Sequence, residues 1–589
     1  MRVVKALSLI LLCATSVRVA IAQAGAKENA EAAPQARRDG VITGHVVNDA
    51  GRPVAGAPIL VIKSGVKILS GIQTSAADDE GNFKATGLGP GSYMIYANVP
   101  GYVIARAGSE RDHHRVGESV TINLVKGGVI TGRVTDSYGE PMVGVRAQAV
   151  KVRELEGGQK YSGELRERNG RLTDDRGVYR LYGLEPGVYV VGVSNDQSGM
   201  YGGGYSGREA MTWHPSSPRA TAAEITVRGG EEIAGIDIRH REERGHMISG
   251  SVLGDAAPDP MGEGITVMLT SGADRQLVGA TWTYGTKGFA MFGVPDGEYE
   301  VVAFKVSRTQ TDLGNSAPRR VVLKGADVSG IELRIAPPAS VSGRVKVEAG
   351  AAGKSPCEDG AQVRATVEEV LLSAAPEDES QPSIEAIAPY FRFLGGAMGG
   401  APDEKGEFTL RGLAAGRFRI KADLPDDGLY VRAITQPAPG AGKKPADASL
   451  NGIAVKAGEK LSGVEVVIAE GAASLNGRVV PAKEASKLPS RLRVHLIPAE
   501  VLAADDVLRY AEAAVGVDGG FGFKHIAPGK YLLHTRQASE KEANNDRSRP
   551  LAWDAVERAK LRREAAAAKN EIELKACERG KDYVLRLNR

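Results

Sequence analysis

Residues 174–191 read DDRGVYRLYGLEPGVYVV, and close relatives of this stretch recur along the chain. Asp175 and Gly177 form a turn signal, because an aspartate side chain accepts hydrogen bonds from amides ahead of it and glycine adopts positive φ. Apolar residues then alternate along a strand, Pro186-Gly187 marks a second turn, and the alternation resumes. The stretch therefore predicts a turn, a half-buried strand, a tight turn and a second strand.

This unit occurs five times. Further copies stand at residues 79–95, 288–304, 404–420 and 519–534, although the third unit lacks the acidic turn residue and the fifth has His525 where glycine is expected. Each unit also opens with a short strand that carries a glycine. The openings are ITGHVV (42–47), ITGRVT (130–135), ISGSVL (248–253), VSGRVK (341–346) and LNGRVV (475–480). Units of this length bury their own cores, so we predict separate domains and no stacked solenoid.

Strand signals recur at roughly 8–12-residue spacing with turn residues between them, which is typical of antiparallel β-sandwiches. After a linker at 23–39, the predicted sandwiches span residues 40–126, 128–240, 246–336, 339–470 and 474–589. The fourth contains an acidic, glycine-rich insertion at 373–401. The fifth contains an amphipathic helix at 551–570, which we expect to pack on its own sandwich.

The N-terminus carries a processing signal. Arg2 and Lys5 precede an apolar run at residues 6–15, and Ala20-Ile21-Ala22 has the small-x-small pattern of a signal peptidase site. The run is too short to cross a membrane. We predict a signal peptide at residues 1–22 and an exported protein, located in the periplasm, on the outer-membrane surface or outside the cell.

Charge excludes one class of partner. The sequence has 75 basic and 72 acidic side chains, and removal of the signal peptide takes away Arg2, Lys5 and Arg18 but no acid. The mature chain is therefore formally neutral. A neutral chain has no electrostatic basis for general nucleic-acid binding.

Two cysteines, Cys357 and Cys577, remain after cleavage, in different predicted units. An oxidising compartment would permit a disulfide between them, but nothing in the sequence places them close together. We interpret them as two unpaired structural thiols. Their spacing does not match that of zinc ligands.

Three motifs together resemble the carboxypeptidase regulatory-like domain family: the G-x-V opening, the G-x-P turn after it in the first two units, and the D-x-x-G-x-[FY]-x-x-x-G-L-x-P-G-x-Y stretch. The resemblance is strongest over residues 40–126 and 128–240 and extends more weakly over almost the whole mature chain. It implies a transthyretin-like (prealbumin-like) seven-strand β-sandwich, related to the Cna B-type and starch-binding-like folds. The predicted fold class is thus all-β, a tandem array of about five such domains with one helix in the last. In metallocarboxypeptidases this module is an appendage and not the catalyst.

The sequence offers little for catalysis. His240-Arg241-Glu242-Glu243 matches the H-x-x-E of a zinc carboxypeptidase, but it stands between two units, where a solvated connector is expected. His113-His114 has metal-ligand chemistry, although adjacent histidines in a polar loop are more often only solvated. Lys63 is a conceivable isopeptide donor of the Cna B kind, without an identifiable partner. No nucleophile elbow, P-loop or dinucleotide fingerprint occurs. We predict no enzyme, no metal and no cofactor.

The best candidate for binding is the glycine-rich loop at residues 198–218, which carries Tyr201, Tyr205, Trp213 and His214. Aromatic rings suit stacking on the C–H faces of sugars, and loops on a rigid sandwich commonly carry binding residues. The alternative, which we favour, is that these aromatic residues fold back as a lid on their own sheet.

The sequence thus indicates an exported, non-enzymatic scaffold or adhesion and binding module, built as an elongated monomeric array. Its expected partner is an envelope protein or a polysaccharide bound through loop aromatics. An accessory part of a peptidase or another enzyme is the third hypothesis.

Overall fold

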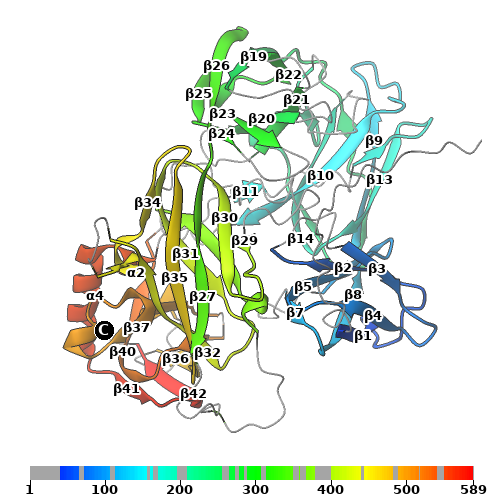
Figure 1. Ribbon diagram of the computed structural model, residues 1–589. Helices are drawn as coiled ribbons and strands as arrows, with labels where there is room; N and C mark the ends of the chain where they lie inside the picture. Colours follow the sequence, from blue (N-terminus) through cyan, green and yellow to red (C-terminus); the bar gives the residue numbers. More distant parts are fainter. Residues whose placement is uncertain are drawn as a thin grey trace, which may run out of the picture.

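The structure is a computed structural model, in which the chain forms five β-units joined end to end (Figure 1). The residues it describes are 40–65, 72–105, 113–154, 160–162, 170–194, 209–254, 264–271, 277–283, 288–306, 314–348, 357, 366–377, 399–438, 444–481, 488–516, 518–539 and 550–587. The predicted signal peptide and linker, and most of the predicted insertion at 373–401, lie outside these ranges.

The elements fall into five consecutive sets. Unit 1 contains β1 (Gly40–Asn48), β2 (Pro58–Lys63), β3 (Ile72–Ala76), β4 (Asn82–Leu88), β5 (Ser92–Ala97), β6 (Tyr102–Ile104), β7 (His114–Arg115) and β8 (Ser119–Lys126). Unit 2 contains β9 (Gly128–Thr135), β10 (Arg146–Glu154), β11 (Lys160–Ser162), β12 (Arg171–Leu172), β13 (Val178–Leu184), β14 (Gly187–Ser194), β15 (Thr212–Trp213), η4 (Arg219–Thr221), β16 (Ile225–Val227), β17 (Glu232–Ile233) and β18 (Ile238–Arg239). Unit 3 contains β19 (His246–Leu253), β20 (Gly264–Ser271), β21 (Leu277–Thr283), β22 (Gly288–Val294), β23 (Gly297–Val306), β24 (Asn315–Ser316), β25 (Arg319–Leu323) and β26 (Val328–Ala336).

The last two units also contain short helices. Unit 4 contains β27 (Ala339–Glu348), η6 (Val367–Glu369), β28 (Leu371–Pro376), β29 (Gly399–Gly400), β30 (Glu407–Leu413), β31 (Gly416–Asp423), β32 (Leu429–Gln436), β33 (Ala446–Asp447), α2 (Ala448–Asn451), β34 (Ile453–Val455) and β35 (Lys460–Glu470). Unit 5 contains β36 (Ala473–Val480), β37 (Leu492–Pro498), η8 (Val501–Ala503), η9 (Val507–Arg509), β38 (Ala511–Ala514), β39 (Gly520–Ile526), β40 (Gly529–Gln537), η10 (Leu551–Trp553), α4 (Ala555–Ala568), β41 (Glu571–Leu574) and β42 (Arg579–Arg586).

All five units share one arrangement of seven strands. The opening strand lies between the first strand of the repeated stretch, to which it is antiparallel, and the closing strand, to which it is parallel. These trios are β4-β1-β8, β13-β9-β17, β22-β19-β26, β30-β27-β35 and β39-β36-β42. Four further strands pair as β3-β2-β5-β7 in unit 1, and their counterparts do so in the other units. The predicted all-β array of seven-strand sandwiches is therefore confirmed.

The tyrosine near the end of the repeated stretch bonds its strand to the turn that precedes it. Tyr189 is buried, and its hydroxyl donates a hydrogen bond to the carbonyl oxygen of Glu185, four residues earlier, at 2.7 Å. This bond fastens the second strand to the turn that precedes it. Tyr93, Tyr299 and Tyr531 make the same bond in units 1, 3 and 5. Unit 4 has Phe418 at this position and lacks the hydroxyl.

An aspartate holds the turn before the first strand. In unit 2 the acceptor is Asp174, and not the predicted Asp175, because its carboxylate receives the amides of Arg176 and Val178 at 3.0 and 2.7 Å. Asp78 and Asp403 likewise accept the amide four residues on in units 1 and 4. In unit 5 the corresponding position is Gly516, and Asp518 accepts the amide of Gly520. The carboxylate therefore closes the turn in this way in units 1, 2 and 4.

The opening glycine is required by a close approach of two strands. A Cβ atom on Gly250 would lie 1.9 Å from the carbonyl oxygen of Ile331 in the closing strand, which no side chain tolerates. The equivalent distances at Gly44, Gly132, Gly343 and Gly477 are 2.3, 2.0, 1.8 and 2.4 Å. The glycine is thus what allows the opening and closing strands to pair.

Each unit buries a hydrophobic core of its own. In unit 2 the core contains Tyr179, Leu181, Leu184, Tyr189 and Val191, the residues on the buried faces of the two strands. Separate clusters fill units 1, 3, 4 and 5. This agrees with the expectation that each repeat is self-sufficient.

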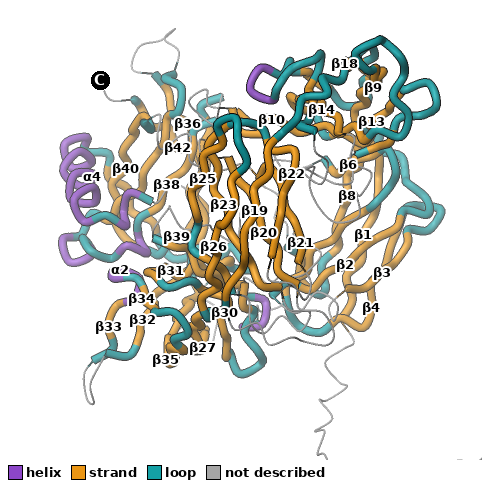
Figure 2. The backbone as a smooth tube through the Cα atoms, turned by 90° about the horizontal axis from the view of Figure 1, so that it is seen from above, coloured by secondary structure: helices purple, strands orange, loops and turns teal. Residues whose placement is uncertain are grey.

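The chain does not run straight. Unit 3 stands at the top of Figure 1, units 2 and 1 descend on one side and units 4 and 5 on the other, and unit 1 lies beside unit 4. Figure 2 shows the same units from above. Arg115 and Glu369, which are 254 positions apart, are joined by a hydrogen bond. This closed arrangement differs from the elongated string predicted from the sequence.

The helix predicted at 551–570 is present as α4, preceded by η10. Leu561 and Ala565 pack against Ile497 on the outer face of the sheet of unit 5, so the helix does lie on its own sandwich. None of the helices in the described ranges has the length and apolar character that a bilayer crossing requires.

Candidate functional site: the contacts between units

The loop predicted to bind sugars lies only partly within the described residues. Tyr201 and Tyr205 fall outside them. Trp213 is 4% exposed, pairs through its backbone with Gly192 in β14, and packs against Val190. The guanidinium of Arg219 lies 4.7 Å from the centre of its ring. Trp213 therefore lies against its own sheet and offers no open face to a sugar.

His214 also faces its own unit. Its Nδ1 lies 2.7 Å from the carbonyl oxygen of Asp237, and the cis peptide bond that follows leads to Pro215, whose carbonyl accepts the amide of Arg239. This segment thus runs along β18 and covers the edge of the closing strand. The structure brings Trp213 and His214 together as parts of the sandwich wall.

The histidine of the H-x-x-E motif is buried in unit 2. His240 is 2% exposed, its Nδ1 accepts the amide of Glu242 at 3.2 Å, and its Nε2 lies 3.3 Å from Glu209. Burial lowers the pKa of His240, although the nearby carboxylates Glu209, Glu242 and Asp136 act in the opposite direction. Within the described ranges no group of three or more His, Cys, Asp or Glu side chains is placed to hold a metal ion.

The other singled-out polar residues of unit 1 lie near its contact with unit 4. His113 contacts the hydroxyl of Ser64 at 3.1 Å, and His114 lies 3.5 Å from Glu118. Lys63 donates to the carbonyl oxygen of Pro90 at 2.5 Å, and burial lowers its pKa. All three of these contacts join residues of unit 1.

A groove of about 500 Å³ lies on unit 3 between β25 and β26. Four of its lining residues are polar, and they include Arg320, which is paired with Glu298 at 2.6 Å. The lining is Arg319, Arg320, Val321, Val322, Val328, Ser329, Gly330, Ile331 and Glu332. The lining has one hydroxyl side chain, Ser329, and one carboxylate, Glu332, and it contains no histidine or cysteine.

The contact between units 1 and 4 centres on Arg115, at the edge of unit 1. Its Nε donates to Glu369 Oε2 at 2.8 Å, and its Nη1 lies 3.6 Å from Asp426 Oδ2. The side chains of Arg115 and Glu369 are 12% and 5% exposed. Burial raises the pKa of Glu369, although Arg115 and the amide of Thr366 counteract that rise. A desolvated carboxylate is therefore held by a cation from a distant unit.

The loop that supplies Asp426 also holds unit 5. Asp427 lies 3.5 Å from Lys524, and its carbonyl oxygen accepts Nη1 of Arg579 at 3.1 Å. The carbonyl of Gly428 accepts the amides of Gly471 and Ala472, in the linker that leads into unit 5. Residues 425–428 thus touch units 1 and 5 at once, and we name this segment the junction loop.

Cys357 and Cys577 form a disulfide bond, with their Cα atoms 5.4 Å apart. The interpretation of two unpaired thiols was therefore wrong. The amide of Cys577 also bonds to the carbonyl oxygen of Gly471 in the linker. The two residues are 220 positions apart, so a comparison of local sequence could not have paired them. The bond links unit 4 to unit 5.

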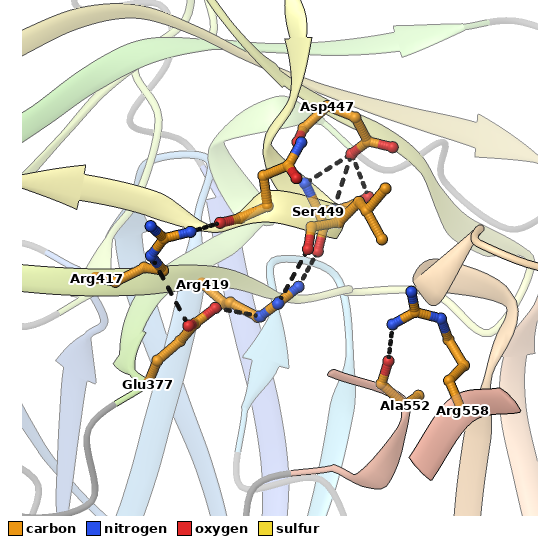
Figure 3. Close-up of polar contacts among 9 residues, drawn as sticks. Glu377, Arg417, Arg419, Asp447, Ser449, Ala552 and Arg558 are labelled. Atoms are coloured by element: carbon orange, nitrogen blue, oxygen red, sulfur yellow. Dashed lines mark hydrogen bonds and ion pairs between the residues drawn. The ribbon is translucent and has the colours of Figure 1, made fainter. Parts of the chain in front are cut away.

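A buried polar cluster completes the contact between units 4 and 5 (Figure 3). Arg419 is 5% exposed, its Nε lies 2.8 Å from Glu377 Oε1, and its terminal nitrogens donate to the carbonyl oxygens of Ser449 and Leu450. Its guanidinium lies 5.0 Å from the ring centre of Trp553 in unit 5. Cation–π contacts of this kind contribute about 0.5–2 kcal/mol.

The position of Trp553 is set from within unit 5. Arg558 of α4 is buried, donates to the carbonyl oxygen of Ala552 at 2.8 Å, and pairs with Asp505 at 2.9 Å. Figure 3 shows the bond from Arg558 to Ala552. This bond holds η10 in place, and Trp553 is the next residue of η10. Sequence reasoning missed this cluster, although Phe418-Arg419 departs from the repeat at this point.

Comparison with known families concerns unit 1. Residues 41–124 match the model of the family described as carboxypeptidase regulatory-like domain, in agreement with the predicted resemblance. Units 2–5 share the strand order of unit 1. A search of curated proteins finds no match.

Several solved structures are similar at low identity. The TIE protein of Bacillus anthracis is 13% identical over 51% of this chain and 51% of its own length, with a TM-score of 0.13. The minor pilin GBS52 of Streptococcus agalactiae is 14% identical over 34% of this chain and 96% of its own, with a TM-score of 0.19. The shaft pilin spaA of Lactobacillus rhamnosus GG is 11% identical over 34% and 98%, with a TM-score of 0.16. Likeness at this level carries no argument about activity or partner.

Proposed function

We propose that the chain is an exported, non-catalytic scaffold, which brings five β-sandwiches into one closed arrangement and presents loops of several units to a partner outside the cytoplasm. The observation that carries the proposal is the contact of Arg115 with Glu369 and Asp426. Independent modules on a string do not need a desolvated ion pair between units that are far apart in sequence. A scaffold whose distant units meet in a closed arrangement does.

Two features support export. Residues 1–22 have the composition of a signal peptide, and the Cys357–Cys577 disulfide is of a kind that persists in oxidising compartments. The periplasm, the outer-membrane surface and the extracellular medium all provide that environment. An envelope protein is the partner class that fits such a location.

The chemistry of the described residues supports a structural role and not a catalytic one. The buried charged groups Arg419, Glu369 and Arg558 are occupied by ion pairs and backbone carbonyls at the contacts between or within units. Catalytic groups with perturbed pKa values, in contrast, converge on an open cleft. The accessory-subunit hypothesis is weaker for the same reason.

One experiment tests the proposal. The full chain is expressed with its N-terminal segment, the cell is fractionated, and photo-cross-linking groups are placed on exposed positions of units 1, 3 and 5. We expect a mature chain that begins near Gln23 in the exported fraction and one envelope protein cross-linked from more than one unit. Retention in the cytoplasm, or turnover of a peptide substrate by the purified chain, would contradict the proposal.

Carbohydrate binding by the loop at 198–218 is a separate hypothesis. Because Trp213 lies under Arg219, binding would depend on Tyr201, Tyr205 and His214. A polysaccharide retention assay with Tyr201→Ala/Tyr205→Ala tests it, and Trp213→Phe serves as the matched variant. Loss of retention in the double variant alone supports a sugar site on this loop.

A further inference from the structure

Units 1 and 4 are held together differently from units 4 and 5. The second contact combines a disulfide, the stacking of Trp553 on Arg419, and Leu508 of unit 5 packed against the core of unit 4. The contact between units 1 and 4 depends on charged side chains. Among the described residues no hydrophobic core cluster spans units 1 and 4.

The two surfaces are electrostatically complementary. Unit 1 contributes Lys63 and Arg115, and unit 4 contributes Glu368, Glu369 and Asp426. Glu368 also acts on Lys63 through its charge, whereas Glu118 of unit 1 opposes the ionised form of Glu369. Apart from these groups, Ala401 of unit 4 lies close to Gly65 of unit 1.

We propose that this contact is a reversible electrostatic latch, through which unit 1 closes onto unit 4 and can release it while units 4 and 5 stay joined. The closed state is the arrangement in Figure 1. In the open state units 1–3 swing away as an arm, and the acidic surface formed by Glu368, Glu369 and Asp426 becomes accessible to a cationic segment of a partner.

Mobile ions can compete with the latch because it is not fully enclosed. Asp426 retains 23% of its side-chain exposure and Arg115 retains 12%, whereas Glu369 retains 5%. The distance over which charges act falls from about 10 Å at 0.1 M salt to about 3 Å at 1 M. Since both surfaces belong to one chain, closure is intramolecular and needs only modest affinity, which makes it easy to reverse.

The contact between units 4 and 5 is less sensitive to salt. Its exposed pair of Lys524 with Asp427 can be screened, but its disulfide is covalent and Arg419 is 5% exposed, so the units stay joined. The molecule is thus expected to open at one place only. The movement would be taken up at the short linkers between sandwiches. Examples are Gly127, between units 1 and 2, and Pro337-Pro338, between units 3 and 4.

Small-angle X-ray scattering of the full mature chain measures closure directly. We expect the radius of gyration to increase as sodium chloride rises from 0.05 to 1 M, and the wild-type chain to return to its compact form on dilution. Arg115→Glu should be extended at every salt concentration, because loss of one partner of a buried pair shifts the open-to-closed ratio by about 100-fold or more.

Matched variants separate opening from unfolding. Arg180→Glu reverses a charge in the exposed Arg180–Glu232 pair within unit 2 and should leave the scattering unchanged. Glu369→Gln keeps a side chain that can accept the amide of Thr366 but removes the charge, and should open at lower salt than wild type. Hydrogen exchange of the core strands of units 1 and 4 should match wild type in both latch variants.

The latch is overturned if Arg115→Glu and Glu369→Gln both scatter as the compact wild type, or if opening is accompanied by loss of exchange protection in the cores of units 1 and 4. The inference goes beyond the scaffold function and can fail separately. A chain that is exported and bound by an envelope protein but never opens retains the scaffold role without a latch.

Discussion

His525 of unit 5 has a left-handed backbone conformation, with φ of 58°, and its Nδ1 lies 2.9 Å from the carbonyl oxygen of Leu429 in unit 4. In the other four units this position is glycine, with φ of 71–72°. The histidine therefore adopts a conformation that costs about 1–2 kcal/mol for a residue with a Cβ. The strained residue is the one that reaches across to the neighbouring unit.

We expect His525→Gly to relieve the backbone strain and to weaken the contact between units 4 and 5. The two effects oppose each other within unit 5, so its own stability should change by less than about 1 kcal/mol. Hydrogen exchange should instead rise at the junction loop. An unchanged junction loop would show that the hydrogen bond to Leu429 contributes nothing to the contact, and His525→Asn, which also tolerates positive φ, is the control.

The repeated tyrosine predicts a local stabilisation. Tyr189→Phe removes the hydroxyl that donates to Glu185 and leaves the ring in the core, so unit 2 should lose about 1 kcal/mol. Chemical denaturation followed by hydrogen-exchange mass spectrometry assigns the loss to a unit. The reciprocal change, Phe418→Tyr, supplies unit 4 with the missing hydroxyl and is the matched variant. If Tyr189→Phe is neutral, the bond is not what fastens the strand to its turn.

How much of the structure the sequence predicts depends on how many positions separate the residues that interact. The alternation around Tyr179 and Leu181 predicted the strands correctly, because a strand face is specified by neighbouring residues. The partner of Arg115 could not be predicted, because Glu369 is 254 positions away and lies in a different repeat. The same holds for Cys357 and Cys577.

Part of the missing information was nevertheless present in the sequence. Two of the places where the repeat departs from its pattern, Phe418-Arg419 and His525, both lie at the contact between units 4 and 5. The fold of the repeat does not itself require different residues at these positions. A departure from the repeat pattern therefore indicates a contact with another unit. Trp213 is different. It also stands in a segment outside the repeat pattern, but it is buried against the sheet of its own unit.

The opening glycine allows a sharp comparison within unit 3. Gly250→Ala should destabilise that unit by about 1–3 kcal/mol, because the new Cβ would lie 1.9 Å from the carbonyl oxygen of Ile331 and must displace backbone. Gly288→Ala, on the neighbouring strand, meets its nearest atom at 3.8 Å and should be tolerated. Equal effects of the two substitutions in a denaturant titration would refute the close-approach argument.

The disulfide should stabilise the contact between units 4 and 5 and not the units themselves. Cys577→Ser removes the covalent link, and we expect unit 5 to unfold separately from unit 4, with a loss of about 2–4 kcal/mol in their joint stability. Calorimetry with and without reductant measures this. Reductant should have no effect on the variant, and a single joint transition in the variant would show that Trp553 and the junction loop suffice.

His240 predicts how unit 2 responds to acid. Burial lowers the pKa of His240 in the folded chain, whereas in the unfolded chain the imidazole titrates near about 6.5. The unfolded state therefore binds a proton that the folded state does not. Stability contributed by the neutral imidazole is complete above that pH and is lost as pH falls below it.

We expect unit 2 of the wild-type chain to lose stability between about pH 7 and pH 5, within the range in which unfolded histidine becomes protonated. His240→Asn retains an acceptor for the amide of Glu242 but does not titrate, so its exchange protection in unit 2 should fall less over the same range. His534, whose pKa is also lowered by burial, lies in unit 5 and is common to both proteins. If the two proteins lose protection in unit 2 equally, protonation of His240 is not coupled to the folding of this unit.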